Sequence, residues 1–317
     1  MPLRQIELPS LGRSLSVLMA HPSSSYGEAH EVALQTYHRQ SGNALHLHGE
    51  GGEVHSRRET GAWLRAHRLR QSYFVCTQIC HDDWDETNKQ PINSFTPRAV
   101  HDDITTDLDL IGTDFLDMVY LDDRPELAFE PVIEAIGREI ASGRLRSFSV
   151  RNFTSERLRA AQMFALDTIG QGIAAVVTTE LSLFVANYPL WSEYVPFDKK
   201  LRQEVAELGL GVLAHVGDFT AGQCAFGDED PVARMRPEWI ERWQHPANID
   251  IATAIQEVAA ERGCTTREIQ VAWLLNQPFP VVAIVSLPTF QTEIGAQYKR
   301  GSQISLTDEE LVRLRNH

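Results

Sequence analysis

Short apolar runs alternate with longer amphipathic segments along most of the chain. The runs have the length of buried strands, and the segments between them repeat apolar residues at helical spacing. The eight predicted strands are Leu15–Ala20, Ala44–His48, Tyr73–Gln78, Met118–Asp122, Arg146–Val150, Ala175–Leu181, Gly211–His215 and Val281–Ser286. Strands that alternate with helices form a parallel sheet with crossover helices, and eight such units close into a barrel. The pattern therefore predicts an α/β protein with one single-domain (β/α)8 TIM barrel over residues 1–317.

The predicted helices lie between these strands and carry their own start signals. They cover Glu28–Gln40, His55–His67, Thr96–Ile111, Glu130–Ser142, Ser155–Phe164, Lys199–Glu207, Ile249–Arg262 and Thr266–Leu274. Thr265, followed three residues later by Glu268, has the spacing of a capping box, and Thr307 with Glu310 repeats it before a C-terminal helix. The longest irregular segment, 216–248, follows the seventh strand. In a barrel, such a loop is expected to lie over the mouth.

Composition narrows the classes of partner. Apolar residues make up 43% of the chain and charged residues 23%, as in an ordinary globular protein. The formal net charge of −14 disfavours nucleic acid, whose binding needs clustered Lys and Arg. There is no export signal in Met1–Ala20 and no apolar run of about 20 residues that could span a membrane. We therefore expect a cytoplasmic protein with a small-molecule substrate and no nucleic-acid or membrane partner, and we leave its oligomeric state open.

Several segments carry the motifs of one enzyme family. Residues Phe115–Leu121 read FLDMVYL, and residues Gly143–Phe153 read GRLRSFSVRNF. Together they resemble the aldo-keto reductase superfamily, which writes the second segment as G-K-I-R-x-I-G-V-S-N-F. Gly209–Ala214 (GLGVLA), Val271–Leu275 (VAWLL) and Leu306–Glu310 (LTDEE) extend the similarity in the family's order. The resemblance implies the barrel fold and carbonyl reduction with NADPH.

The resemblance also implies a catalytic tetrad of Asp, Tyr, Lys and His. In the family, Tyr protonates the carbonyl oxygen, the Asp-paired Lys lowers the pKa of that Tyr, and His orients the substrate. Here His46 stands at the Asp position, Gly51-Gly52 at the Tyr-Gly position, Gln78 at the Lys position and Asp122 at the His position. Because all four members differ, the sequence predicts that this chain is not a conventional NADPH carbonyl reductase.

The residues that the resemblance places in contact with the nicotinamide also differ from those of the family. Asn152 keeps one polar anchor for the nicotinamide carboxamide, but Arg151 replaces the Ser before it. Thr178 stands in place of a Gln on the sixth strand. On the seventh strand, His215 stands in place of the Tyr that stacks under the nicotinamide.

The phosphate end of the implied cofactor site has changed further. The family places Pro-Gly and a basic residue after the eighth strand, where this chain has Val285-Ser286 and no Lys or Arg before Lys299. Phosphate recognition without a flexible glycine or a cation is weak. The sequence therefore disfavours NADP(H) binding.

Titratable side chains stand at or near the positions that the tetrad occupies in the family. His46 and His48 are two residues apart on one strand, so both point to the same face. The other titratable residues expected near the mouth are His21, Glu50, Asp122 or Asp123, Glu180 and His215. Converging imidazoles and carboxylates can bind a divalent metal, with His46 and His48 as the candidate ligands. We favour a metal-free acid/base site instead, with His46 or His48 as the base and Asp122 as its partner.

Arg151 has two interpretations of equal weight. Its guanidinium could hold a substrate carboxylate or phosphate through a bidentate pair. Alternatively, it forms an ion pair with Asp122, Asp123 or Glu180.

Three functions from different classes follow from these residues. The first, which we favour, is a non-redox lyase, dehydratase or isomerase acting on a small metabolite, anionic if Arg151 binds it. Its expected catalytic residues are His46, His48, Gln78 and Asp122, and its expected substrate-binding residues are Arg151, Glu180 and His215. The second is an NADP(H)-dependent oxidoreductase with an unconventional proton donor, supported by Asn152 in the cofactor site. The third is a catalytically silent pseudoenzyme that binds a ligand or a partner protein, since scaffold and chemistry are separable.

Overall fold

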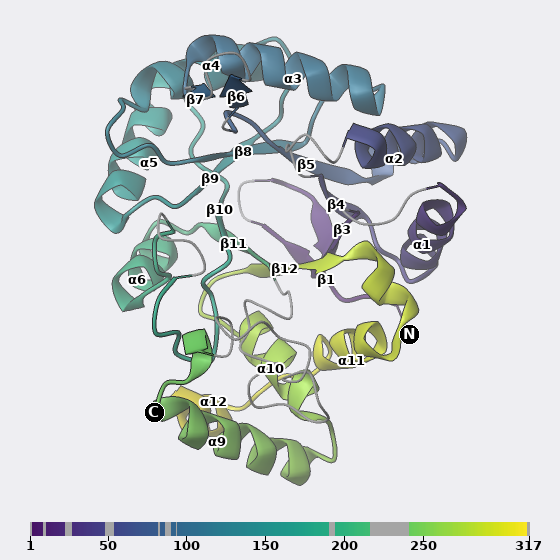
Figure 1. The fold of residues 1–317 in the computed structure, drawn as a ribbon, viewed down its shortest axis with the longest axis vertical. Coiled ribbons are helices and arrows are strands. Elements are labelled where there is room, and N and C mark those ends of the chain that lie inside the picture. The colour runs from purple at the N-terminus through teal and green to yellow at the C-terminus, as the bar shows by residue number, and fades with distance from the viewer. Residues whose placement is uncertain are drawn as a thin grey trace.

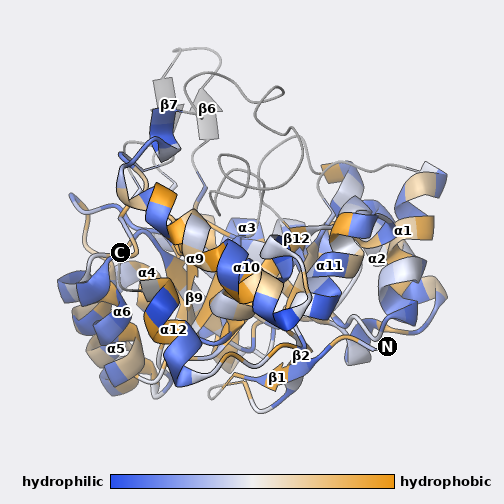
Figure 2. Ribbon diagram, turned by 90° about the horizontal axis from the view of Figure 1, so that it is seen from below, coloured by the Kyte–Doolittle hydropathy of each residue, from blue (hydrophilic) through white to orange (hydrophobic). Residues whose placement is uncertain are grey.

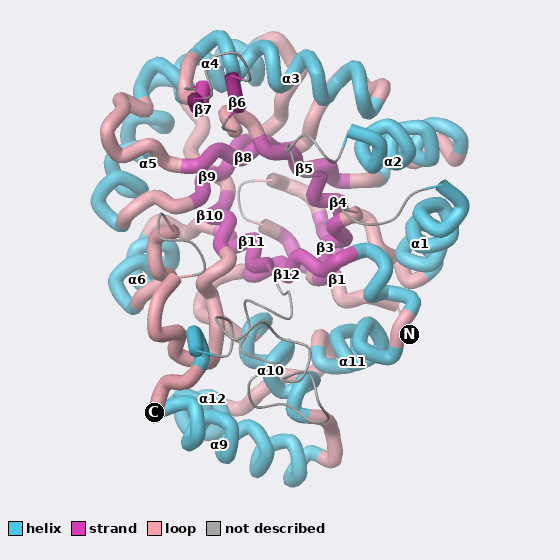
Figure 3. The backbone as a smooth tube through the Cα atoms, in the orientation of Figure 1, coloured by secondary structure: helices cyan, strands magenta, loops and turns pink. Residues whose placement is uncertain are grey.

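Eight parallel strands close into a barrel, which confirms the predicted fold. The structure is a computed structural model that describes residues 2–8, 11–22, 27–47, 54–81, 83–85, 90–92, 94–189, 194–215 and 241–315. The barrel strands are β3 (Leu18–His21), β4 (Ala44–Leu47), β5 (Phe74–Gln78), β8 (Met118–Asp122), β9 (Phe148–Arg151), β10 (Ala175–Thr178), β11 (Gly211–His215) and β12 (Val281–Ser286). Each strand pairs in parallel with the next, and β12 pairs with β3 to complete the ring (Figure 3).

Helices surround the barrel on its outer side (Figure 1). They are α1 (Gly27–Arg39), α2 (Val54–Ala66), α3 (Pro97–Ile111), α4 (Glu130–Ala141), α5 (Ser155–Ile169), α6 (Lys199–Glu207), α9 (Ala247–Arg262), α10 (Thr266–Leu275), α11 (Glu293–Gly301) and α12 (Asp308–Arg315), with short 3-10 helices η2 (Arg70–Ser72) and η4 (Leu287–Gln291). Thr265 and Glu268 form the predicted capping box at the start of α10. Within the described part of the chain, no helix combines the length and the apolar composition that crossing a bilayer requires.

The first predicted strand is in fact two strands. β2 (Ser14–Ser16) pairs antiparallel with β1 (Gln5–Glu7), and the barrel strand β3 begins only at Leu18. A second hairpin, β6 (Asp83–Asp85) with β7 (Gln90–Ile92), follows β5. Figure 2 shows β1 and β2 at the lower edge of the molecule, below the barrel. Apolar runs alone did not separate these short antiparallel pairs from the barrel strands.

Residues 216–240 of the predicted irregular segment lie outside the described residues, and residues 241–248 are described. Its described end is more ordered than predicted, because α9 already begins at Ala247, directly after Pro246. Trp243 is buried there, and the side chain of Asn248 bonds to Val185. This end of the segment is therefore packed against the chain that follows β10.

The amino end of the barrel is closed by a charged cluster around Asp117, which is 1% exposed. Arg13, Arg70 and Arg146 each place a guanidinium nitrogen 2.8 to 3.1 Å from its carboxylate. The same carboxylate accepts a hydrogen bond from the backbone of Val75. Because conserved chemistry of barrels sits at the opposite end, we interpret this cluster as structural.

Candidate active site

The alternation of side chains along each strand decides which residues reach the inside of the barrel. On β8, Met118 and Tyr120 belong to the inner apolar cluster, whereas Val119 and Leu121 belong to the outer one. Asp122 therefore lies on the inward side, one step past Tyr120 toward the carboxyl end. The same rule places five more residues inside the barrel at this end, namely His21, His46, Gln78, Arg151 and His215.

Three of these side chains form what we call the imidazole cluster, made of His21 on β3, His46 on β4 and His215 on β11. The ring centre of His46 lies 5.3 Å from that of His21 and 5.0 Å from that of His215. The rings of His21 and His215 are 6.2 Å apart. His46 is fully buried, while His21 and His215 are partly exposed toward the mouth. These three residues were predicted to lie near the mouth of the barrel, and in the structure their rings are in contact.

The hydrogen bonds of His21 define its tautomer. Its Nδ1 lies 2.9 Å from the backbone oxygen of His46 and 3.3 Å from Nδ1 of the same residue. A carbonyl oxygen only accepts, so Nδ1 of His21 carries a hydrogen, and Nε2 is the nitrogen that gains or loses the titrating proton. Burial lowers the pKa of His21 below its ordinary value, and the bond to His46 offsets part of that effect. His21 is therefore neutral at pH 7.

Tyr120 links the imidazole cluster to the polar groups on the far side of the barrel. Its ring stacks on that of His46, with centres 5.2 Å apart and planes 21° apart. Its hydroxyl donates to Oε1 of Gln78 at 3.1 Å, and Nε2 of Gln78 donates to Asp122 at 3.0 Å. Burial raises the pKa of Tyr120 well above its ordinary value, although the nearby Arg151 acts in the opposite direction. The phenol thus stays protonated and orients Gln78.

Sequence reasoning missed Tyr120 because it lies in a run that reads as core. The signal that could have found it is its spacing. Tyr120 is two residues before Asp122 and so shares the inward face of β8.

Asp122 is held by three side chains. Nε and Nη2 of Arg151 donate to its two carboxylate oxygens, both at 2.5 Å, and Nδ2 of Asn152 donates to Oδ1 at 3.0 Å. Gln78 supplies the third contact. The strand register explains the pair, because Asp122 on β8 stands opposite Arg151 on β9. Of the two interpretations of Arg151, the structure shows the ion pair with Asp122.

The predicted acid/base pair of His46 and Asp122 is not formed. Among the described residues Asp122 bonds to Gln78, Arg151 and Asn152, and no hydrogen bond joins it to the ring of His46. The cause is topological, since β5 lies between β4 and β8 in the barrel. His46 therefore does not bond to Asp122, and the alternative base, His48, lies outside the described residues.

The sequence also offered His46 and His48 as candidate ligands of a divalent metal. His48, together with Glu50, lies outside the described residues. Within the described ranges, no three His, Cys, Asp or Glu side chains are arranged to hold a metal ion.

Glu180 and Thr178, two residues named in the sequence analysis, lie at the carboxyl end of β10. Glu180 is buried and paired with Arg242 at 2.8 Å, which ties the described end of segment 216–248 to the mouth. Thr178 follows Val176 on the outward side of β10, and its hydroxyl accepts the backbone N–H of Glu180.

Asn152 has a special backbone conformation. Its φ is +63°, in the left-handed region that asparagine tolerates better than most residues. The turn lets its side chain fold back to Asp122, and its Oδ1 lies 3.4 Å from the backbone nitrogen of Val195. Strained backbone of this kind is concentrated at functional sites.

Comparison with known protein families agrees with this geometry. The model of the Aldo/keto reductase family matches residues 50–317, which is most of the chain. The chain belongs to the aldo/keto reductase family. The predicted family is therefore confirmed. The replacement of the tetrad and its chemical consequences remain our interpretation.

The family implies a nicotinamide cofactor, and the residues at the mouth can be tested for its fit. The ring of His215 is partly exposed at the end of β11, where an aromatic face can lie against a nicotinamide. The amide of Asn152 has a second N–H and a second oxygen lone pair beyond its bonds to Asp122 and Val195. The nicotinamide end therefore fits the residues present.

The phosphate end fits less closely. η4 and α11 follow β12, and the first residue of α11 is Glu293, which bonds to Arg300. Arg300 also bonds to Glu268. In this described stretch, Arg300 is therefore already paired with two carboxylates.

Proposed function

We propose that this aldo/keto reductase family member is a nicotinamide-dependent oxidoreductase whose proton is carried by His21 of the imidazole cluster, in place of the family's tyrosine. The family default is NADPH-dependent oxidoreduction, which supports the redox class. The observation that carries the proposal is the gathering of His21, His46 and His215 at the carboxyl end of the barrel, where barrel enzymes place their chemistry.

The reaction class requires a proton as well as a hydride. A reduced nicotinamide, when bound, would supply the hydride that the carbonyl carbon of the substrate needs. The carbonyl π electrons move to oxygen, and protonated His21 gives that oxygen the proton from Nε2, which leaves His21 neutral. In the oxidation direction, neutral His21 accepts the proton of the alcohol at the same nitrogen.

The surrounding residues hold this group in place. The carbonyl oxygen of His46 fixes the Nδ1–H of His21 and hence the ring orientation. Tyr120 supports His46 from the other side by stacking. Because two neighbouring imidazoles would repel each other if both were charged, we expect the cluster to carry one positive charge at most. Arg151 and Asp122 neutralise each other, which suits a carbonyl substrate without net charge.

The first experiment is direct binding. Purified protein is titrated with NADH and with NADPH, following the emission of the reduced nicotinamide. Micromolar affinity for either dinucleotide is expected. If neither binds at millimolar concentration, the redox proposal fails, and the non-redox or catalytically silent alternatives take its place.

The second experiment tests His21. Reduction of an activated aldehyde, 4-nitrobenzaldehyde, is measured from pH 5 to pH 9 in the wild type and in His21→Gln. Because reduction needs protonated His21, its rate should fall as the pH rises through the lowered pKa of this residue, and alcohol oxidation should show the opposite trend. The matched control is His67→Gln, which changes an exposed histidine at the end of α2. An unchanged pH profile in His21→Gln would exclude His21 as the proton carrier.

A further inference from the structure

The charged cluster at the amino end of the barrel carries more positive than negative charge. Its members are Asp117, Arg13, Arg70 and Arg146. Within the described ranges, Asp117 is the only carboxylate that forms an ion pair with any of these arginines. Three guanidiniums against one carboxylate leave two positive charges in excess, in a chain whose formal net charge is −14.

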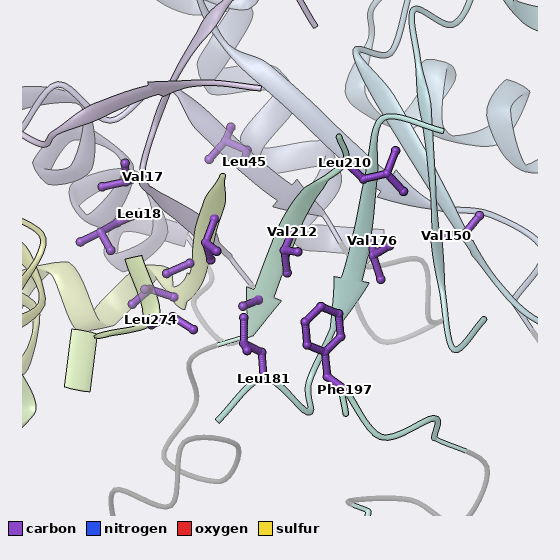
Figure 4. Packing of buried hydrophobic residues seen from close by; sticks show 14 of the residues in the cluster. Val17, Leu18, Leu45, Val150, Val176, Leu181, Phe197, Leu210, Val212 and Leu274 are labelled. Carbon is purple, nitrogen blue, oxygen red and sulfur yellow. The ribbon is translucent and has the colours of Figure 1, made fainter. Parts of the chain in front are cut away.

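The residues around the cluster do not balance this excess. Asp117 directly precedes β8, and the residues that directly precede β3 and β11 at the same end are Val17 and Leu210. Figure 4 shows both among the buried apolar side chains. Asp114 is exposed, and it forms no ion pair with the three arginines in the part of the chain that the structure describes. The excess charge is therefore left to solvent or to a bound anion.

The carboxylate of Asp117 has no further capacity for hydrogen bonds. Its Oδ1 accepts from Nη1 of Arg13 at 2.8 Å and from Nη1 of Arg146 at 3.1 Å. Its Oδ2 pairs with Nη1 of Arg70 at 2.8 Å and accepts the backbone N–H of Val75 at 3.0 Å. A carboxylate offers about four lone pairs, so all of them are used. Burial lowers the pKa of Arg70, Asp117 raises it, and the other two arginines lower it further.

Arg146 has donors that the described residues do not use. Its side chain is 48% exposed, and its Nη1 is the nitrogen that bonds to Asp117. Nε and Nη2, which form the parallel fork of this guanidinium, have no acceptor among the described residues. Arg70, in contrast, uses Nε for Thr113 and Nη2 for the backbone oxygen of Phe115. The fork of Arg146 therefore offers the paired geometry that carboxylates and phosphates accept.

Phe115 holds this fork in place. The Cζ atom of Arg146 lies 3.8 Å from the ring centre of Phe115. Stacking occupies the face of a guanidinium and leaves its edge open. Arg13 bonds to the same carboxylate oxygen as Arg146, so a second positive charge lies beside the fork. An anion at the fork thus meets a positioned guanidinium and a neighbouring cation, which lowers the cost of ordering the site.

We propose that this end of the barrel binds a phosphate dianion, held by the Nε–Nη2 fork of Arg146 and by the charge of Arg13. Two excess positive charges favour a dianion over a monoanion. Inorganic phosphate and the phosphate group of a small organic ester share this chemistry. The site lies at the opposite end of the barrel from the imidazole cluster, so the proposal does not rest on the proposed redox function.

The test is calorimetric titration of the whole protein at pH 8 and constant ionic strength with phosphate, phenyl phosphate and, as the monoanion, acetate. We expect one equivalent of phosphate to bind, and acetate to bind at least about tenfold more weakly, because acetate leaves one positive charge unbalanced. Arg146→Gln should weaken phosphate binding at least about tenfold. The variant should keep the fold, because Arg13 and Arg70 still pair with Asp117. Tighter binding of phenyl phosphate would assign the site to an organic ester, and equal or weaker binding to inorganic phosphate.

Arg98→Gln is the matched control. Arg98 is 89% exposed and pairs with Asp102 within α3, so this variant should bind phosphate as the wild type does. As a second readout, phosphate should raise the unfolding temperature of the wild type and of Arg98→Gln more than that of Arg146→Gln. No detectable phosphate binding, equal affinity for phosphate and acetate, or equal affinity in the wild type and Arg146→Gln would overturn the proposal.

Discussion

Replacing Arg151 with Met tests how strongly the mouth depends on its central ion pair. The side chains of Arg151 and Asp122 are only 8% and 14% exposed, and the contact is bidentate. Removing one partner of a buried pair costs about 3 to 5 kcal/mol, because the other charge stays buried without compensation. Gln78 and Asn152 still donate to Asp122 in the variant. We therefore expect the lower end of that range, a loss of about 3 kcal/mol in the free energy of unfolding.

Urea unfolding followed by tryptophan fluorescence and by far-ultraviolet circular dichroism measures this loss. The double variant Arg151→Met with Asp122→Asn should recover part of the stability, since it removes the uncompensated charge. Lys200→Gln, which breaks an exposed pair with Glu156, should leave the unfolding midpoint unchanged. A loss below about 1 kcal/mol in Arg151→Met, with no recovery in the double variant, would refute the reasoning that this pair is buried and uncompensated when broken.

Three other predictions follow from the same structure. Tyr120→Phe removes the donor to Gln78, so the free energy of unfolding should fall by about 1 kcal/mol in urea titrations. The folded pKa of His21 lies below its unfolded value near 6.5, so the folded state binds fewer protons. Stability should be full above pH 6.5 and decline as the pH falls, and His21→Phe should reduce this decline in thermal unfolding scans. In Gly61→Ala, the added carbon would lie 2.1 Å from the backbone oxygen of Ile111, so α2 and α3 must separate, and we expect a loss of about 1 to 3 kcal/mol in urea titrations.

Much of the architecture followed from the periodicity of the sequence. The resemblance to the family implied that His46, Gln78 and Asp122 lie at one end of the barrel, and the alternation of inward and outward residues along their strands agrees with it. The capping box at Thr265 was equally local, because both of its hydrogen bonds lie within four residues. Features of this kind need no knowledge of the neighbours of a residue.

The contacts between strands could not be predicted in the same way. Whether Arg151 faces a substrate or Asp122 depends on the register of β8 against β9, which apolar spacing does not determine. The helix α11, which has nine residues, was not among the predicted helices. Thr178 stands in place of a Gln in the family's cofactor site, and the alternation along β10 places it on the outward side.

The register of β8 and β9 also bears on the choice between redox and non-redox chemistry. A lyase or isomerase built on His46 needs a carboxylate to orient that imidazole and to raise its pKa. The one expected to do so, Asp122, bonds instead to Arg151, Asn152 and Gln78. Among the described contacts, His46 stacks on Tyr120 and His21 bonds to the backbone oxygen of His46, and burial lowers the pKa of His21. A histidine with a lowered pKa is a strong proton donor when it is charged, and it is neutral at pH 7. These properties suit reversible proton exchange with a carbonyl and its alcohol better than abstraction of a carbon-bound proton.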